Sequence, residues 1–165
     1  MSTLLSKKTD YALLILSHLN EHPSGGSARE IADRFGLSKA FLANILKEMC
    51  QKGFLTSHRG VKGGYALARS ADRINLAELF EAMEDGLRLT MCTGHQKPDE
   101  QDCTIQNMCP IRGPINAIHQ RIFEVFRNVT LADVFQHPYS DSTFQSVLSI
   151  LNSTPAGAGV HEVTA

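Results

Sequence analysis

What the sequence lacks excludes several classes of protein. None of its 165 residues belongs to an apolar run that approaches the length of a membrane span, so we expect no transmembrane helix. Residues 1–8 lack the apolar core and the small-residue cleavage site of a signal peptide, which predicts a cytoplasmic protein. The chain also has no phosphate-binding glycine motif, no carboxylates paired for catalysis and no nucleophile–base pattern, and we therefore expect no enzyme.

Charge is distributed unevenly along the chain. The composition, with 42% hydrophobic and 20% charged residues, is that of a soluble globular protein. Residues 1–75 carry 11 Lys and Arg against 6 Asp and Glu, a net of +5, and residues 76–165 carry 5 against 11, a net of −6. This predicts that only the first half meets a polyanion, and chance clustering on a solvated surface is the alternative.

Three helices are predicted in the first third of the chain. Apolar residues recur at helical spacing over residues 6–21 and predict a mostly apolar helix. Ser27 and Glu30 form a capping box at the start of a short second helix, which ends in a glycine-containing turn. Ser38 then caps a third helix over about 38–52. This order is typical of a helix-turn-helix.

A β-hairpin is predicted directly after these helices. Two short apolar segments, 54–57 and 64–68, flank a basic linker that is rich in glycine. A helix-turn-helix followed by a basic hairpin is the order of elements in a winged helix-turn-helix. We therefore predict a mainly α fold with a small β-hairpin wing.

A DNA-reading surface is predicted on the outer face of the third helix and on the wing. Asn44 is suited to pair with a base edge in the major groove, above all that of adenine. The amino end of the helix is suited to hold a phosphate, and the wing cations suit a minor groove or the DNA backbone. The alternative is that these are ordinary solvated side chains on a small helical domain. The predicted DNA-binding residues are Ser38, Lys39, Asn44, Lys47, Arg59 and Lys62.

The second half of the chain is predicted to carry a long helix with a heptad seam. Asn75 caps a helix over about 76–85, a polar loop with cysteines runs over about 90–113, and Pro114 suits the first turn of the long helix. The seam residues, spaced three, four, three and four apart as in a coiled coil, are Ile115, Ile118, Ile122, Val125 and Val129.

These features divide the chain into three parts. Residues 1–75 are predicted to form the winged helix-turn-helix domain, and residues 76–139 the cysteine loop and the long helix. Residues 140–165 are predicted to be a partly disordered extension, with one more helix over 141–151, because residues 152–165 are rich in Ser, Thr, Gly, Ala and Pro.

Three cysteines lie within 18 residues of the polar loop and are predicted to bind a metal. Ten residues separate Cys92 from Cys103, and five separate Cys103 from Cys109. In a reducing compartment, thiolates in such a loop are better explained by a metal than by disulfides. The spacing does not distinguish a zinc ion, completed by His95 or His119, from an iron–sulfur cluster with a weaker fourth ligand. A redox thiol switch and three unligated cysteines are the remaining interpretations.

The motifs together resemble the Rrf2 family of transcriptional regulators over about residues 4–136. The resemblance rests on the sequence TDYAL at residues 9–13, on RGVKGGY at residues 59–65 in the wing, and on a three-cysteine loop before a long helix. It implies a homodimer built on the helix at about 114–129, which binds double-stranded DNA at a palindromic operator. It also implies an iron–sulfur cluster, 4Fe–4S or 2Fe–2S, on the three loop cysteines.

The family's subgroups differ in the fourth cluster ligand. In one subgroup a histidine three residues after the last cysteine serves, but this chain has Arg112 there, whose cationic guanidinium does not suit iron. In the nitric-oxide-sensitive repressors of the family an aspartate of the first helix reaches over from the partner subunit, and Asp10 matches that position. Alternatively, Asp10 is a carboxylate favoured by the helix dipole. The family commonly has a shorter gap between its first two loop cysteines than the ten residues found here, which leaves His95 as a substitute candidate.

The function implied by the resemblance is that of a homodimeric, sequence-specific transcriptional regulator, most simply a repressor. Its cluster would report nitric oxide, redox state or iron status to the DNA-binding surface. A zinc- or thiol-based DNA-binding sensor with the same fold is the first rival interpretation. A cluster carrier without a role on DNA is the second.

Overall fold

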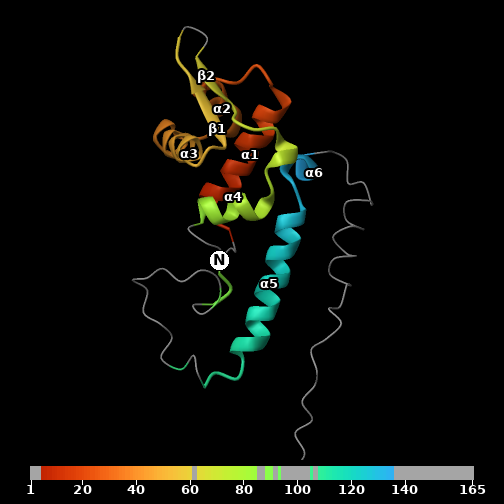
Figure 1. Ribbon diagram of the computed structural model, residues 1–165. Coiled ribbons are helices and arrows are strands. Elements are labelled where there is room, and N and C mark those ends of the chain that lie inside the picture. The colour runs from red at the N-terminus through yellow and green to blue at the C-terminus, as the bar shows by residue number, and fades with distance from the viewer. Residues whose placement is uncertain are drawn as a thin grey trace, which may run out of the picture.

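The computed structural model describes residues 5–60, 63–84, 88–90, 93, 105 and 108–135. Most of this part of the chain is helical and its strands form an antiparallel hairpin, which confirms the predicted fold class. No helix within these ranges is both long and apolar enough to span a membrane. In chain order the elements are α1 (Lys7–Glu21), α2 (Ala28–Phe35), α3 (Lys39–Gln51), β1 (Leu55–His58), β2 (Gly64–Leu67), the 3-10 helix η1 (Ala71–Arg73), α4 (Leu76–Met83), α5 (Arg112–Asn128) and α6 (Leu131–Phe135) (Figure 1).

Local capping signals set the boundaries of α2 and α3, as predicted. The Glu30 carboxylate accepts a hydrogen bond from Ser27 N at 2.7 Å, and Ser27 Oγ accepts one from Glu30 N at 3.2 Å, so the capping box is complete. Gly36 ends α2 with a φ of 62°, a conformation that costs glycine little. Ser38 then caps α3. The tight turn between the two helices therefore follows from three short sequence signals.

A hydrophobic core forms between α1, α2, α3, α4 and the hairpin. One face of α1 and one face of α3 are buried in this core. Each large apolar side chain removed from water contributes about 1.5–3 kcal/mol, so this core is the main source of stability. The core continues across the expected domain boundary at residue 75, because α4 packs against α1. The largest fully buried side chains are Phe54, Ile15, Leu16, Leu19, Ile31, Leu42, Ile45, Leu46, Met49, Ile74, Leu79 and Met83.

The hairpin is fastened to the segment that enters α2. Its strands pair in antiparallel register from Leu55 opposite Leu67 to His58 opposite Gly64. Gly26 N donates to Tyr65 O at 2.9 Å, and Tyr65 N donates to Gly26 O at 2.8 Å. A Cβ on Gly64 would lie 2.5 Å from Gly26 O, so this close approach requires glycine. The wing and the helix-turn-helix are therefore joined by backbone hydrogen bonds.

The long helix α5 leaves the body of the molecule and packs on α4 through aromatic side chains (Figure 1). The ring of Phe126 meets Phe80 of α4 edge-on, with centroids 5.0 Å apart. The buried residues of α5 are His119 and Phe123. Ile118 of the predicted seam is 50% exposed, and the other seam residues are half-buried. The described chain therefore covers the phenylalanine face of α5 and leaves the heptad seam partly exposed.

The short helix α6 begins after Thr130, whose side chain caps it. Thr130 N and Thr130 Oγ1 donate to Asp133 Oδ2 at 2.8 and 2.7 Å. An isolated bridge between Asn75 and Thr130 brings the starts of α4 and α6 together. Residues 136–165, which include the helix predicted over 141–151 and the disorder predicted over 152–165, lie outside the described residues.

Candidate functional site

The outer face of α3 presents the predicted DNA-binding side chains to solvent. Its inner stripe is buried in the core, which fixes the rotation of the helix about its axis. Ser38, Lys39, Asn44 and Lys47 are all exposed. Ser38 also caps the helix, because its Oγ accepts a hydrogen bond from Phe41 N at 3.3 Å. The helix therefore has the burial pattern required of one that enters a major groove.

The start of α1 supports α3 through an ion pair and an aromatic contact. Lys8 Nζ lies 3.0 Å from Glu48 Oε1. The ring of Tyr11 meets the ring of Phe41 edge-on, with centroids 5.7 Å apart. Asp10, between these two α1 residues, is exposed in the first turn of the helix. The turn that carries Asp10 is thus in direct contact with α3.

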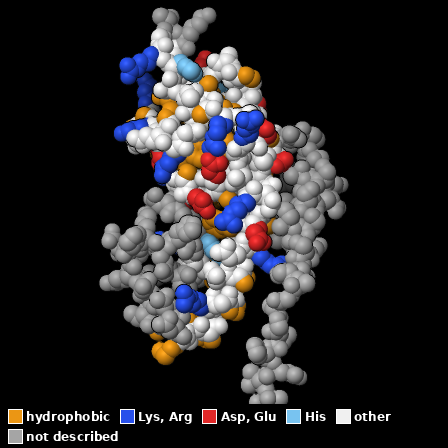
Figure 2. Space-filling view, viewed as in Figure 1, with side chains coloured by type: hydrophobic (Ala, Val, Ile, Leu, Met, Phe, Trp, Pro, Cys, Tyr) orange, Lys and Arg blue, Asp and Glu red, His pale blue; other side chains and the backbone are white. Residues whose placement is uncertain are grey.

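The wing carries one predicted cation within the described residues. Arg59 is exposed just after β1, and Lys62 lies outside the described residues. Gly63 N donates to Gly60 O at 2.8 Å and closes the turn beyond β1. Figure 2 shows Lys and Arg side chains along the edge of the winged end, on the side where Figure 1 places α3 and the hairpin. Basic side chains therefore gather at the predicted DNA-reading surface.

The structure locates one of the three loop cysteines. Cys109 is half-buried, forms no disulfide, and precedes α5 by three residues. Its carbonyl oxygen accepts a long hydrogen bond of 3.4 Å from Arg112 N, at the beginning of that helix. Cys92, Cys103 and His95 lie outside the described residues. Cys109 is therefore the one predicted thiolate ligand within the described residues, and it lies just before α5.

Within one chain, Asp10 and Cys109 are not brought together. Figure 1 shows the start of α1 at the level of α4 and the start of α5 at the far end of the long helix. His119, the other histidine considered as a zinc ligand, is buried, and its ring packs against Phe123 with centroids 4.6 Å apart. Burial lowers the pKa of His119. These are the surroundings of a core residue.

An anchor on Glu84, which no local sequence pattern indicates, joins the start of α1 to the end of α4. Ser6 N and Ser6 Oγ each donate to Glu84 Oε1 at 2.8 Å, and Thr9 Oγ1 donates to the same oxygen. Burial raises the pKa of Glu84, but these hydrogen bonds outweigh it and hold the pKa below its ordinary value. Glu84 directly precedes the segment that leads to the cysteine loop. The Glu84 anchor therefore connects that segment to the turn that carries Asp10.

Thr93, the residue after the first loop cysteine, is hydrogen-bonded back to Leu89 and Thr90. Thr93 is fully buried, and its Oγ1 accepts from Leu89 N at 3.1 Å and from Thr90 N at 3.0 Å. The same hydroxyl donates to Thr90 O at 3.0 Å. The residue next to Cys92 is therefore held by its own side chain in a closed turn.

Comparison with known proteins places these features in a family. The sequence pattern of the Rrf2 family, described as iron-dependent transcriptional regulators, matches residues 5–137. The chain is 27% identical over 135 residues to the HTH-type transcriptional regulator NsrR of Bacillus licheniformis, an alignment that covers 81% of this chain and 92% of that protein. Such relatives are transcriptional regulators and not enzymes.

Solved structures show the same fold. The global cysteine regulator CymR (YrzC) of B. subtilis matches with a TM-score of 0.58 at 24% identity, over 82% of this chain and 97% of that one. IscR of T. potens matches with a TM-score of 0.58 at 23% identity, over 84% of this chain and 94% of that one. The winged helical architecture predicted from the sequence is confirmed by these neighbours.

Proposed function

The chain belongs to the Rrf2 family of transcriptional regulators, and from that membership we propose that it is a homodimeric repressor whose affinity for a palindromic DNA operator is set by an iron–sulfur cluster. The observation that carries the proposal is the exposed polar face of α3, held beside the wing by the core and by the pairing of Gly26 with Tyr65. The proposed signal is nitric oxide, redox state or iron status.

In the proposed complex, α3 lies in the major groove of the operator. Asn44 hydrogen-bonds an adenine edge, and such a contact gives about 1–3 kcal/mol of discrimination against a wrong base. Because phosphate contacts release counterions, binding weakens steeply as salt rises. The proposed contacts to phosphates or, on the wing, to the minor groove come from Ser38, Lys39, Lys47, Arg59 and Lys62.

The proposed dimer is built on the heptad seam of α5. Ile118 is 50% exposed, and Ile111, one heptad earlier, is 61% exposed. The phenylalanine face of the same helix is covered by α4, so it is not free to meet a partner. Apolar side chains open at heptad spacing suit a second copy of the same helix. A two-fold dimer would place its two α3 helices on half-sites about one helical turn apart, roughly 34–36 Å, or a multiple of it.

The donor set of the cysteine loop fits an iron–sulfur cluster. Cys109 is a free, half-buried thiol, and Cys92 and Cys103 add two more ligands of the kind that such clusters use. Asp10 of the partner subunit is the proposed fourth ligand, because Asp10 is exposed and the start of α1 lies far from Cys109 of its own chain. When bound, a 4Fe–4S or 2Fe–2S cluster supplies a centre that reacts with nitric oxide and oxidants.

The chain's own contacts provide a path from the cysteine loop to the DNA-binding surface. The Glu84 anchor holds the first turn of α1 to the end of α4, next to the segment that leads into the loop. The same turn holds α3 through the ion pair of Lys8 with Glu48. We propose that a rearrangement of the loop reaches α3 through these two contacts. Regulation then requires that the protein bind DNA more tightly in one arrangement of the cysteine loop than in the other.

A gel-shift titration on palindromic and scrambled duplexes tests the DNA-binding proposal. We expect one dimer on each palindrome, and an affinity that falls steeply with salt. Asn44→Ala should reduce the preference for the palindrome, whereas Asn20→Ala, a matched change at an exposed position of α1, should keep it. Equal binding to both duplexes by the unsubstituted chain would contradict the proposal.

A further inference from the structure

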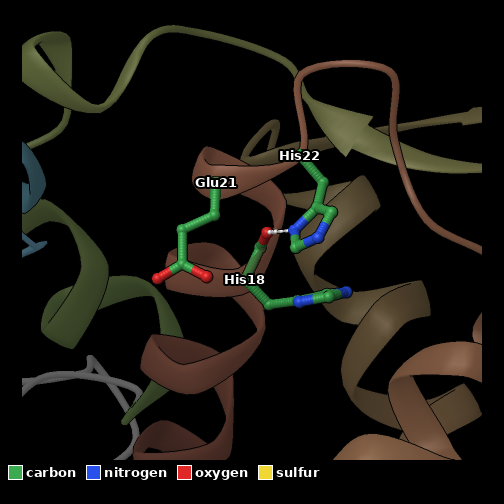
Figure 3. Close-up of side chains that lie close together, drawn as sticks. All are labelled: His18, Glu21 and His22. Atoms are coloured by element: carbon green, nitrogen blue, oxygen red, sulfur yellow. Dashed lines mark hydrogen bonds between the residues drawn. The ribbon is translucent and has the colours of Figure 1, made fainter.

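A group of potential metal ligands lies at the end of α1, away from the cysteine loop. His18 and Glu21 lie in the last turn of α1, and His22 is the residue that caps its end, so the three occupy positions i, i+3 and i+4. One potential ligand atom from each lies within 4.8 Å of the others. Figure 3 shows the two imidazoles side by side and the carboxylate on the same turn. The proposed function gives none of these three residues a role.

His18 supplies a second, independent observation. The residue is 8% exposed, and its Nδ1 has no hydrogen-bond partner among the described residues. A buried polar atom left unpaired costs about 1–3 kcal/mol, so a bound partner is expected. Burial, and to a smaller extent His22 and Arg34, lower the pKa of His18. A lowered pKa favours the neutral imidazole, which is the form that binds metals.

The other two side chains are free to turn toward a bound ion. His22 Nδ1 lies 2.7 Å from His18 O, which leaves its Nε2 for a ligand. Glu21 pairs with Arg34 at 3.8 Å, and both side chains are more than half exposed, at 57% and 53%. Such a surface pair contributes about 0–1 kcal/mol and is given up at little cost. The ligand atoms lie up to 4.8 Å from one another, whereas bonds from zinc to nitrogen and oxygen are about 2.0–2.2 Å long. The exposed side chains of Glu21 and His22 must therefore move closer to His18 when an ion binds.

We propose that His18, Glu21 and His22 form a site for a divalent transition-metal ion, with Zn²⁺ as the best match. Two imidazoles and a carboxylate are a ligand set that zinc uses in proteins. Two histidines at i and i+4 on one helix face have the spacing that binds zinc in known helical sites. Three protein ligands leave the fourth tetrahedral position to water.

The site lies where α1 meets the attachment point of the wing. A Cβ on Gly26 would lie 3.6 Å from His18 Nε2, and Gly26 pairs with Tyr65 of β2. The His18 ring also meets Phe35 of α2 edge-on, with centroids 6.0 Å apart. An ion bound here lies beside the entry to α2. The DNA-binding unit thereby carries a candidate metal site that is separate from the cysteine loop.

A zinc titration of the full-length chain tests the site. Because loop thiols also bind zinc, the three loop cysteines are replaced by serine, and Zn²⁺ is titrated in competition with a chromophoric chelator. We expect a single Zn²⁺ per chain. His22→Gln and Glu21→Gln should each weaken binding more than about tenfold, because each removes a ligand. His58→Gln, at an exposed histidine of β1, is the matched control and should leave the affinity unchanged.

Cobalt absorption provides a second measurement on the same chain, with its three loop cysteines replaced by serine. Co²⁺ at the proposed site gives a visible spectrum of nitrogen and oxygen ligation without thiolate charge transfer, and this spectrum should disappear in His22→Gln. Circular dichroism verifies that the variants, changed at exposed positions, remain folded. Absence of zinc and cobalt binding at this site, or binding that survives in both variants, would overturn the proposal and point to water as the partner of His18. DNA binding in the gel shift does not depend on this outcome.

Discussion

The DNA-binding head, residues 5–84, and the region of the cysteine loop and α5 differ in how their apolar surfaces are covered. In the head, the stripes of α1, α3 and α4 meet one another, and their largest side chains are fully buried. In the second region, large apolar side chains stay open, and those at least half exposed are Ile105, Met108, Ile111 and Ile118. The core of the head is therefore closed within this chain, with Phe123 and Phe126 of α5 completing it at α4. The second region instead leaves apolar side chains exposed for a partner to cover.

The difference also concerns the functional residues. The proposed DNA contacts on α3 have their positions fixed by a buried stripe on the same helix. The proposed cluster ligands come from a loop and, for Asp10, from a different element, so a ligand and a second chain must bring them together. A rigid reading surface joined to a region that depends on a ligand is the arrangement expected of a sensor.

Leu46→Ala should have the largest effect, because it opens a cavity in the core of the head. Leu46 is fully buried, and a cavity at such a position costs about 2–5 kcal/mol of unfolding free energy. Chemical denaturation followed by circular dichroism measures the loss. Ile118→Ala is the matched control, and at concentrations where the chain is monomeric it should cost less than about 1 kcal/mol. Equal losses would show that the seam of α5 is already packed within one chain.

Ile118→Asp should disrupt the proposed dimer of α5 without unfolding the head. A charge placed in an apolar dimer seam costs several kcal/mol, so we expect dimerisation to weaken by about 100-fold or more. Sedimentation equilibrium measures the dissociation constant. Gln120→Asp, at an exposed position two residues further along α5, should leave it nearly unchanged. A dimer that tolerates Ile118→Asp would assign the interface to another surface.

Asn44→Ala and Lys62→Ala separate base recognition from phosphate binding within the head. Asn44→Ala should remove about 1–3 kcal/mol of preference for one base pair and leave the salt dependence unchanged. Lys62→Ala should weaken binding to all sequences and reduce the slope of log affinity against log salt by about one. Fluorescence anisotropy over a range of salt concentrations separates the two effects. Identical profiles for both variants would contradict the assignment of base and phosphate contacts.

Glu84→Gln tests the anchor between α1 and the end of α4, and should have the smallest effect. The folded pKa of Glu84 is lowered, so its carboxylate stabilises the fold above the ordinary Glu pKa, and this stabilisation is lost as pH falls through the lowered pKa. We expect a loss of about 1 kcal/mol at pH 7 that shrinks below about pH 4. Denaturation at both pH values measures it, with the exposed Glu81→Gln as control. A loss that does not change with pH would mean that the ionised carboxylate is not the stabilising group.

The elements of the head could be predicted because their signals are local. The capping box of Ser27 with Glu30 and the caps at Ser38 and Asn75 each lie within four residues of the helix that they start. The buried stripes of α1 and α3 follow directly from helical spacing. The exposed face that carries the proposed DNA contacts is the complement of the α3 stripe, so its position could be predicted as well.

Other features depend on contacts that no local pattern contains. Ser6 and Glu84 are 78 residues apart, and nothing near either residue indicates that they meet. On α5 both faces carry apolar side chains, so periodicity alone does not show that Phe123 and Phe126 pack inward while Ile118 stays open. The spacing of His18 and His22 is visible in the sequence, but its meaning depends on the burial of His18.

Absorption spectroscopy of anaerobically purified protein, with iron and acid-labile sulfide analysis and a gel shift on the same sample, tests the central claim most directly. The account predicts a coloured protein with iron and sulfide, whose binding to a palindromic operator weakens when nitric oxide is added. Zinc in place of iron and sulfide would favour a zinc-based sensor of the same fold. A colourless protein free of iron and sulfide, with a DNA affinity that nitric oxide does not change, would contradict the account.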